Sequence, residues 1–390
     1  MRILFLGAPV SPQSNPSLSY EQRFAATGQN TGNLLIGQSL FEELQFTEYG
    51  CYDTSLQPCD VNERYDVIVI AAANFIFRKF DLSALTNFIE STKLPCVIVG
   101  LGAQAPATSY KVTDIPDGSR RFLHVVSDRS NTVGVRGYFT AEVMNDFGIK
   151  NVRAVGCPSL YRALTRNLKI VRPDLAKPLR VSLNGSRNVI DHAISPEAAR
   201  RVEAKILMLS IENGYEYVLQ NENPEMQVLW SSEWPTEFVP HVQSIVARLE
   251  LNISENTLIN HIRSKNRLFF ELDEWDKYIS CFDYSLGSRF HGNLIALTNG
   301  VAATILTHDS RTTEMAELMS IPHVPVEDAT HLNVNELAAA GDYDRFERKY
   351  QLLYDRFAEF LNENGLSHKL VECERLVRPG GKLPTGELAL

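Results

Sequence analysis

Short apolar runs alternate with amphipathic segments along the first half of the chain. Apolar runs of about four to eight residues are typical of buried parallel strands, and the amphipathic segments are typical of the helices that cover them. This alternation predicts successive βαβ units in a doubly wound sheet. The predicted strands are residues 2–6, 66–72, 95–102, 132–136 and 151–155, and the predicted helices are residues 31–43, 82–91 and 140–147.

The same alternation resumes after residues 172–178, a segment that begins and ends near a proline and divides the chain into two similar halves. We therefore predict an α/β protein with two Rossmann-like, doubly wound domains that face a cleft. The predicted domains are residues 1–172, residues 179–335, and a terminal helix and tail over residues 340–390. The second half has predicted strands at 179–183, 216–220, 268–271, 284–286 and 301–306, and predicted helices at 195–213, 274–281, 290–298 and 340–364.

Three segments between these elements have no strong periodicity and are predicted to be loops: residues 8–31, 104–132 and 221–240. Long ordered loops in compact domains are often functional. The third contains Trp230 and Trp234, for which stacking on a sugar ring and simple anchoring of the loop are equally good interpretations.

Composition narrows the class of protein. The 390 residues are 44% hydrophobic, which suits a folded protein of two domains, and the net charge of −9 gives no general attraction to nucleic acid. No apolar stretch approaches the ~20 residues that span a bilayer. The N-terminal apolar run is too short for a signal peptide, so we expect a cytoplasmic protein. The six cysteines are scattered without metal-ligand spacing, so we expect no metal site.

The junction at residues 285–300 combines an arginine, a histidine and glycines where a predicted strand gives way to a predicted helix. Free backbone N–H groups and the positive dipole end of a helix N-terminus favour an anion. Arg289 adds a fork that matches carboxylate or phosphate, and His291 adds a group that can carry a proton near neutral pH. The junction therefore predicts an anion site with proton-transfer capacity.

Two more arginines follow predicted strands. Arg136 ends the strand at 132–136, and Arg311 lies in the first turn of a helix that Asp309 or Ser310 can cap. Because ligands in open α/β sheets bind beyond the carboxyl ends of strands, these arginines are predicted to share a site with His291.

Plainer interpretations of the same residues remain open. Arg136 can be a surface arginine, and His291 can be a core histidine bonded to a carbonyl. Arg311 can form a surface pair with Glu314, three residues later on the same helix.

The order of these motifs resembles the polysaccharide pyruvyl transferase family. The resemblance covers roughly residues 1–330, and its strongest part is the Arg-x-His-Gly block. The matching blocks are Asn30-Thr-Gly-Asn33, residues 66–70, Gly100-Leu-Gly102, Val135-Arg136, Val155-Gly-Cys-Pro158, Ser288-Arg-Phe-His-Gly292 and Asp309-Ser-Arg311 with Glu314.

The resemblance implies a fold similar to GT-B glycosyltransferases and transfer of a pyruvyl group from phosphoenolpyruvate to a sugar in cell-surface polysaccharide biosynthesis. The product is a ketal across two hydroxyls of a sugar or lipid-linked oligosaccharide, and peripheral membrane association is compatible with such an acceptor. The N-terminal domain would take the acceptor and the C-terminal domain the donor substrate phosphoenolpyruvate, with no cofactor. The implied catalytic residues are His291, Arg136 and Arg289, and the implied substrate-binding residues are Arg311, Ser288, Gly292, Asn30, Gly32 and Asn33.

The chemistry of phosphoenolpyruvate suits these residue types. Three arginines can neutralise its carboxylate and phosphate, and a ketal requires a proton at the methylene carbon. His291 is the candidate acid: a helix N-terminus lowers its pKa, whereas a bound trianion raises it. Two departures from the family pattern bear on the acceptor side, namely Asn33 in place of Asp and Ala71-Ala-Ala-Asn74 in place of a glycine-rich turn.

Two other functions fit the same motifs. A GT-B glycosyltransferase would bind the diphosphate of a sugar nucleotide beside Arg289 and needs a carboxylate to grip the ribose, for which Glu314 is the candidate. A non-catalytic glycan- or anion-binding protein would need the arginines but not the proton donor His291. The acceptor sugar, the ketal stereochemistry and the oligomeric state are left open by the sequence.

Overall fold

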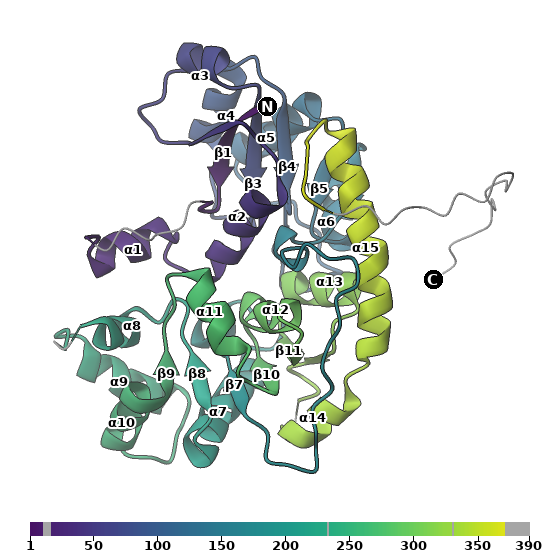
Figure 1. Ribbon diagram of the computed structural model, residues 1–390. Helices are drawn as coiled ribbons and strands as arrows, with labels where there is room; N and C mark the ends of the chain where they lie inside the picture. Colours follow the sequence, from purple (N-terminus) through teal and green to yellow (C-terminus); the bar gives the residue numbers. More distant parts are fainter. Residues whose placement is uncertain (11–16, 232–233, 330, 371–390) are drawn as a thin grey trace, which may run out of the picture.

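The computed structural model describes residues 1–10, 17–231, 234–329 and 331–370, which form two α/β domains one above the other (Figure 1). The first domain has a parallel four-stranded sheet in the order β2-β1-β3-β4, and a bridge between Leu101 and Val135 continues it to the pair β5-β6. Its strands are β1 (Arg2–Gly7), β2 (Glu48–Cys51), β3 (Val67–Ala71), β4 (Cys96–Val99), β5 (Val133–Val135) and β6 (Val152–Ala154).

Helices cover this sheet, and α2 lies on the side that faces the second domain (Figure 1). The helical elements of this part are α1 (Tyr20–Ala26), α2 (Gly32–Glu43), α3 (Pro58–Arg64), α4 (Ser83–Ser91), α5 (Asp117–Arg129), α6 (Tyr138–Asp146) and the short η1 (Pro158–Leu160).

The second domain has a six-stranded parallel sheet in the order β12-β11-β10-β7-β8-β9. The chain reverses direction along the sheet between β9 and β10, as in a doubly wound fold. Its strands are β7 (Val181–Leu183), β8 (Glu216–Val218), β9 (Asn266–Arg267), β10 (Tyr284–Gly287), β11 (Ala302–Thr307) and β12 (His323–Pro325), and its helices are η2 (Arg187–Asp191), α7 (Pro196–Asn213), α8 (Asn223–Trp230), α9 (Phe238–Arg248), α10 (Glu255–Lys265), α11 (Leu272–Ile279), α12 (Phe290–Thr298), α13 (Ser310–Met319) and α14 (Val334–Ala340).

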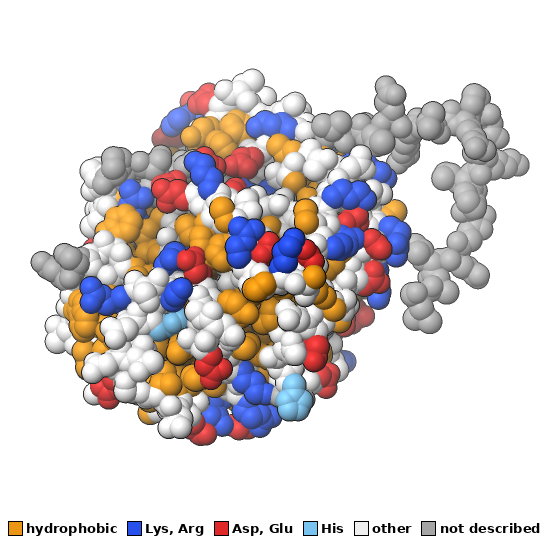
Figure 2. All heavy atoms as spheres, turned by 60° about the horizontal axis from the view of Figure 1, so that its bottom comes forward, with side chains coloured by type: hydrophobic (Ala, Val, Ile, Leu, Met, Phe, Trp, Pro, Cys, Tyr) orange, Lys and Arg blue, Asp and Glu red, His pale blue; other side chains and the backbone are white. Residues whose placement is uncertain are grey.

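The predicted fold class, α/β with two Rossmann-like doubly wound domains facing each other in a GT-B-like arrangement, is confirmed by these sheets. Every strand pair is parallel, and the buried apolar runs that predicted β1, β3 and β4 form the centre of the first sheet. Basic and acidic side chains lie interspersed on the face of the molecule shown in Figure 2. Within the described residues, no helix combines the length and apolarity needed to cross a membrane.

The three segments predicted as loops contain helices, so that part of the prediction was wrong. Helix α1 begins at a capping box formed by Ser19 and Gln22, and α8 has a proline in its first turn. Helix α5 buries one narrow face through Phe122, Leu123 and Val126 and keeps the rest of its surface polar. Short or mostly polar helices have weak periodicity, and capping decides where they begin. Residues 11–16 and 232–233 of the first and third segments lie outside the described residues.

The strand predicted at residues 268–271 was also wrong. Strand β9 pairs two residues earlier, because α10 runs directly into it, and Glu271 already caps α11. The apolar residues behind that prediction lie in a loop, where Phe269 stacks on Trp275 with ring centroids 5.7 Å apart. Aromatic residues that are buried in a loop form a short apolar run, and the sequence alone cannot distinguish such a run from a buried strand.

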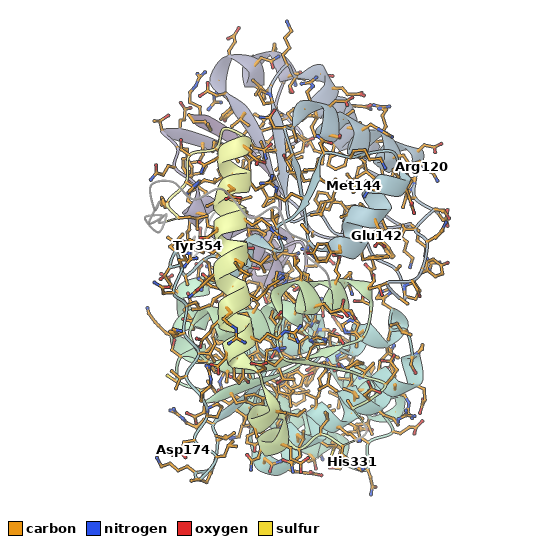
Figure 3. All side chains as sticks on the ribbon, turned by 90° about the vertical axis from the view of Figure 1, so that its right-hand side faces the viewer. Arg120, Glu142, Met144, Asp174, His331 and Tyr354 are labelled. Carbon is orange, nitrogen blue, oxygen red and sulfur yellow. The ribbon has the colours of Figure 1, made fainter. Side chains whose placement is uncertain are left out.

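The terminal helix α15 (Tyr343–Glu363) lies along one side of both domains (Figures 1 and 3). It begins three residues later than predicted. The preceding helix α14 ends just before Gly341, and the Asp342 side chain caps α15 by accepting a hydrogen bond from the Arg345 amide. Near its start Tyr343 reaches the carbonyl of Ala303 in β11, and near its end Glu363 pairs with Arg153 in the first domain. Residues 371–390 of the predicted tail lie outside the described residues.

We expect α15 to contribute strongly to stability through its buried aromatic face. The ring of Phe357 is fully buried and stacks on Tyr161 with centroids 4.3 Å apart. The Phe357→Ala variant should lose about 3–5 kcal/mol of unfolding free energy, measured by denaturant titration, because it leaves a cavity in the core. On the same helix Leu352 is 63% exposed, and Leu352→Ala should stay within about 0.5 kcal/mol of the wild type. Equal losses in both variants would contradict this packing.

Candidate active site between the two domains

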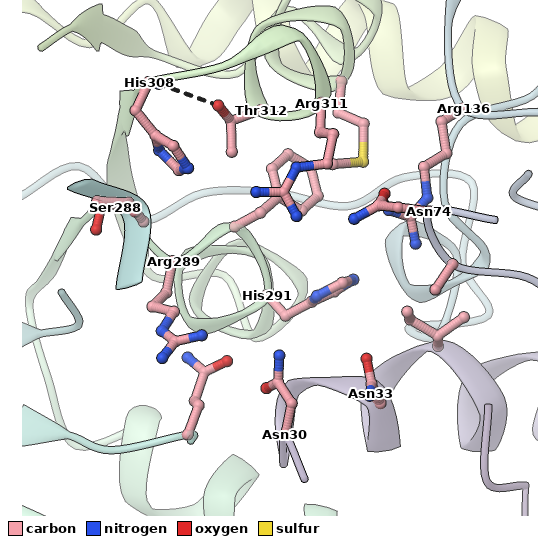
Figure 4. Close-up of a pocket in the computed structure, with 16 residues that line it drawn as sticks. Asn30, Asn33, Asn74, Arg136, Ser288, Arg289, His291, His308, Arg311 and Thr312 are labelled. Atoms are coloured by element: carbon pink, nitrogen blue, oxygen red, sulfur yellow. Dashed lines mark hydrogen bonds between the residues drawn. The ribbon is translucent and has the colours of Figure 1, made fainter. Parts of the chain in front are cut away.

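A cavity of about 120 Å³ lies between the domains and is lined mainly by polar side chains (Figure 4). Each side chain follows the carboxyl end of a strand or the start of α2, because the two sheets direct these ends toward each other. The first domain contributes Asn30, Asn33, Ile36, Ala73, Asn74 and Arg136, and the second contributes Val189, Gln220, Ser288, Arg289, Phe290, His291, His308, Arg311, Thr312 and Met315.

Arg136 is a buried cation with no salt-bridge partner among the described residues. Its side chain donates hydrogen bonds to the carbonyl of Gly100 (2.9 Å), to Asn74 Oδ1 (2.7 Å) and to the carbonyl of Ala72 (3.4 Å), all of them neutral acceptors. Among the described residues no carboxylate forms a salt bridge with it, although only 3% of its surface is exposed. Burial therefore lowers the pKa of Arg136, and an anion in the cavity would relieve this cost.

A glycine makes room for this arginine. A side chain on Gly102 would place its Cβ 2.8 Å from Arg136 Cδ, closer than carbon atoms approach. The loop after β4 therefore lets the guanidinium lie across the ends of two strands and reach the cavity. The second glycine of the Gly100-Leu-Gly102 motif thus makes space for the arginine.

The other two arginines each have one carboxylate partner and keep further N–H groups free. Arg289 contacts Glu222 at 2.6 Å, and Arg311 Nε contacts Asp309 Oδ2 at 2.6 Å. Burial opposes ionisation of Glu222, but Arg289 and Arg187 still hold its pKa at about 2. Two of the three arginines thus have a carboxylate partner, whereas the charge of Glu314 acts on Arg136 without a salt bridge among the described residues. The terminal nitrogens of Arg311 have no protein partner within the described residues and point into the cavity (Figure 4).

His291 lies among the three arginines. Burial, followed by the charges of Arg136, Arg289 and Arg311, lowers the pKa of its imidazole to about 3. The ring is therefore neutral in the free protein at neutral pH. Its Nε2 lies 3.5 Å from Sγ of Cys157, which follows β6 in the first domain. The interpretation of His291 as a core histidine bonded to a carbonyl has no support in these contacts.

Of the substrate-binding residues predicted at the start of α2, two line the cavity and one packs against the second domain. The Asn30 side chain accepts a hydrogen bond from the Gly32 amide at 2.9 Å, and Asn33 Nδ2 donates to the carbonyl of Thr27 at 3.0 Å. Both asparagines line the cavity, whereas Gly32 lies behind the lining. A Cβ on Gly32 would lie 2.5 Å from Gln220 Oε1, so this glycine allows the two domains to approach.

Ser288 and Gly292 also hold the site together from behind. The Ser288 hydroxyl donates to the buried carboxyl of Glu203 and accepts from the Ser186 amide at 3.2 Å, so its hydrogen bonds are already made. A Cβ on Gly292 would lie 2.8 Å from both Asn184 and Gln220. Ser288 lines the cavity, whereas Gly292 does not.

The structure also places His308 in the cavity wall, a residue that the sequence analysis does not single out. Its ring is 2% exposed, and neither ring nitrogen has a hydrogen-bond partner in the described part of the protein, although Nε2 lies 3.8 Å from Asp309 Oδ2. Burial lowers the pKa of His308, so the ring is neutral and can donate one hydrogen bond to a ligand. Its position directly after β11, beside the Asp309-Ser-Arg311 motif, was the signal that could have identified it.

Glu314 does not face the cavity. Its oxygens accept hydrogen bonds from the Thr140 amide (3.0 Å) and the Thr140 hydroxyl (2.7 Å), and it pairs with neither Arg311 nor a ligand position. Burial raises the pKa of Glu314 to about 7. The alternative Arg311–Glu314 pair does not form, because Arg311 pairs with Asp309. Glu314, the candidate ribose ligand of a sugar-nucleotide site, is already bonded to Thr140 across the domain interface. No group of three or more His, Cys, Asp and Glu side chains in the described ranges is arranged to hold a metal ion.

Residues 30–310 match the family described as polysaccharide pyruvyl transferase. The chain belongs to this family. The match includes Asn30, Arg136 and the Arg289–His291 pair, and it makes the protein a transferase of polysaccharide biosynthesis. No curated protein matches the chain.

Solved structures match nearly the whole length of this polysaccharide pyruvyl transferase family member, at low identity. Anabaena HepE in complex with UDP-glucose has a TM-score of 0.45 and 12% identity over 94% of this chain and 97% of that one. A putative UDP-N-acetylglucosamine 2-epimerase from Listeria monocytogenes has a TM-score of 0.41 and 9% identity over 95% and 92%. The glycosyltransferase SnogD from Streptomyces nogalater has a TM-score of 0.32 and 14% identity over 92% and 95%. At these scores the similarity carries no information about substrate.

We expect His291 to remain neutral across pH 5–8 in the free protein, because its pKa is lowered to about 3. Inorganic phosphate in the cavity should raise that pKa, since a bound anion offsets the three arginines. Heteronuclear NMR of the imidazole checks both points, with the His291→Gln variant to assign the signal. An ordinary titration near pH 6.5 in the free protein would contradict the described electrostatics.

Proposed function

We propose that this protein transfers a pyruvyl group from phosphoenolpyruvate to a sugar and forms a pyruvate ketal in cell-surface polysaccharide biosynthesis. The observation that carries the proposal is the unpaired, buried guanidinium of Arg136 beside Arg289, Arg311 and the neutral ring of His291. A site with excess positive charge and one group able to gain a proton suits a small, multiply charged, acid-labile donor.

The charges of phosphoenolpyruvate complement those of the cavity. The donor carries a carboxylate and a phosphate, with up to three negative charges, on a small three-carbon frame. Arg136 approaches the cavity from the first domain, and Arg289 and Arg311 approach it from the second. Planar guanidinium groups on opposite sides can therefore hold the two anionic ends of the donor and fix its orientation.

Ketal formation then follows from proton transfer to the donor. Protonated His291 gives its proton to the methylene carbon, which becomes a methyl group and leaves an oxocarbenium-like centre at the adjacent carbon. A sugar hydroxyl attacks this centre and loses its proton. The phosphate then departs with the bonding electron pair, and the second hydroxyl closes the ring and loses its proton in turn. Arg289 and Arg311 stabilise the charge on the departing phosphate.

Binding of the donor favours the protonated form of His291 that this step requires. In the free protein, burial and the arginines keep His291 neutral, with a pKa of about 3. A bound trianion neutralises the arginines and favours the imidazolium form, so the pKa rises in the complex. By linkage, protonation of His291 strengthens donor binding by the same factor. The acid is therefore charged only when the donor is present.

Two finer points belong to the same proposal. The acceptor is a sugar or lipid-linked oligosaccharide approached from the first domain, and peripheral association with a membrane would bring the protein to a lipid-linked acceptor. The cytoplasmic location and the absence of a further cofactor stay predictions. The sugar-nucleotide alternative is disfavoured because its ribose ligand, Glu314, is bonded to Thr140.

Arg136 is the cleanest test of donor binding, because its removal leaves no carboxylate unpaired. The Arg136→Gln variant should bind phosphoenolpyruvate about 10- to 150-fold more weakly, the equivalent of about 1.5–3 kcal/mol for a charge-assisted contact. Removing Arg289 would instead leave the buried carboxylate of Glu222 unpaired and confuse binding with stability. Isothermal titration calorimetry measures the affinity, and Arg121→Gln, at an exposed ion pair with Glu90, is the control. Unchanged affinity in Arg136→Gln would contradict the donor assignment.

The His291→Gln variant separates catalysis from donor binding. Phosphate release from phosphoenolpyruvate in the presence of sugar acceptors should fall about 10²–10⁴-fold, the usual contribution of a positioned acid. Donor affinity should change much less, because glutamine keeps a polar side chain of similar length. The exposed His124 on α5 gives the matched control, His124→Gln.

The wild-type rate should decline at high pH, as the donor complex loses the proton on His291. Near-normal turnover of folded His291→Gln would refute the general-acid role, and donor binding without acceptor-dependent phosphate release would favour a non-catalytic anion-binding protein.

A further inference from the structure

A second cavity of about 200 Å³ lies beside the first and is also formed by both domains. The first domain supplies two segments after its strands, residues 77–78 and 104–114, and the second domain supplies residues 191–193 at the end of η2. The prediction that the segment 104–132 has a function rested on its length alone, and this cavity gives its first part a definite place.

The two cavities share one wall. Ala105 in the second cavity donates its amide hydrogen to Ser310 Oγ at 2.9 Å, and its carbonyl accepts from the Ser310 amide at 3.3 Å. The Ile194 amide donates to the carbonyl of His308 at 2.9 Å. The wall is therefore the segment 308–311, which carries two of the residues that line the first cavity.

Arg311, in this wall, acts electrostatically on a histidine in each cavity, namely His291 in the first and His192 in the second. Burial and the charge of Arg311 lower the pKa of His192, a lining residue of the second cavity. Asn74 and Phe77, three residues apart on one loop, line the first and second cavities respectively. A ligand in the second cavity would thus lie next to the donor, on the other side of Arg311.

The lining of the second cavity differs in chemistry from that of the first. It offers aromatic surface from Tyr110, which is 57% exposed, and from Phe77, whose ring meets His192 edge-on at 6.4 Å. Around these rings lie Arg78, Lys111 and Asp114, whose side chains make no hydrogen bond or ion pair with any described residue. Positively and negatively charged side chains thus lie beside the aromatic rings of the second cavity. The second cavity lacks the three arginines that line the first.

These features match a pyranose ring. The C–H face of a sugar packs on aromatic surface, and its hydroxyls are both donors and acceptors, so they can bond cationic and carboxylate side chains alike. We propose that the second cavity is the acceptor subsite, which binds a hexopyranose on Tyr110 and Phe77 next to the donor, on the other side of Arg311. The sugar-binding part stands by itself, and the acceptor role rests on the proposed function.

Saturation-transfer-difference NMR with methyl β-galactoside, methyl β-glucoside and methyl α-mannoside tests the sugar-binding part, since these probes lack any aromatic aglycone. At least one should bind the wild-type protein, and Tyr110→Ala and Asp114→Asn should each weaken that binding at least about tenfold. Tyr138 is equally exposed, at 56%, on α6 outside the cavity, so Tyr138→Ala should bind as the wild type does. Asp114→Asn is nearly isosteric, so a folding defect in the other variant would leave the test intact.

Calorimetry with phosphoenolpyruvate on the same variants separates this inference from the proposed function. Donor affinity should remain within about twofold in Tyr110→Ala and Asp114→Asn. If no methyl glycoside binds the wild type, or if Tyr110→Ala and Asp114→Asn bind it normally, the acceptor subsite is refuted while the donor site stands. If the sugar binds as expected and phosphoenolpyruvate does not bind at all, the sugar site stands and the pyruvyl-transfer proposal is refuted.

Discussion

The buried guanidinium of Arg136 is the constraint on which the arrangement of the site depends. A charge held away from water without a salt bridge is costly, and the hydrogen bonds of Arg136 to the described residues go to two backbone carbonyls and the side-chain carbonyl of Asn74. The second domain adds two more arginines, each paired with one carboxylate, and none of its carboxylates within the described residues forms a salt bridge with Arg136. The interface between the domains therefore holds a buried positive charge without a salt bridge, and an anionic ligand would supply its partner.

The fold brings these charges together by a simple rule. Both sheets are parallel, so each directs the carboxyl ends of its strands to one edge, and the two edges face each other. Helix α15 contacts β11 in one domain and Arg153 in the other, which keeps those edges opposed. Burial and the same three arginines also keep His291 neutral in the free protein. The residues that would bind the donor therefore also control the protonation of the candidate acid.

The sequence was enough to predict the shared position of Arg136, Arg289, His291 and Arg311, because strand ends can be located from apolar runs and parallel sheets place those ends together. It could not predict which carboxylates pair with the arginines. Glu222 lies far from Arg289 along the chain, and its role depends on the turn after β8. The position of His308 in the cavity wall and the helix in residues 117–129 were missed for the same reason: tertiary contacts, and not local pattern, determine them.

The most direct test is the crystal structure of the protein with phosphoenolpyruvate. The account predicts the donor in the cavity between the domains, with its carboxylate and phosphate oxygens about 2.7–2.9 Å from nitrogens of Arg136, Arg289 and Arg311. The His291 ring should face the methylene carbon. A donor bound elsewhere, or one that leaves Arg136 without an anionic partner, would contradict the claim that the buried arginine exists to hold it.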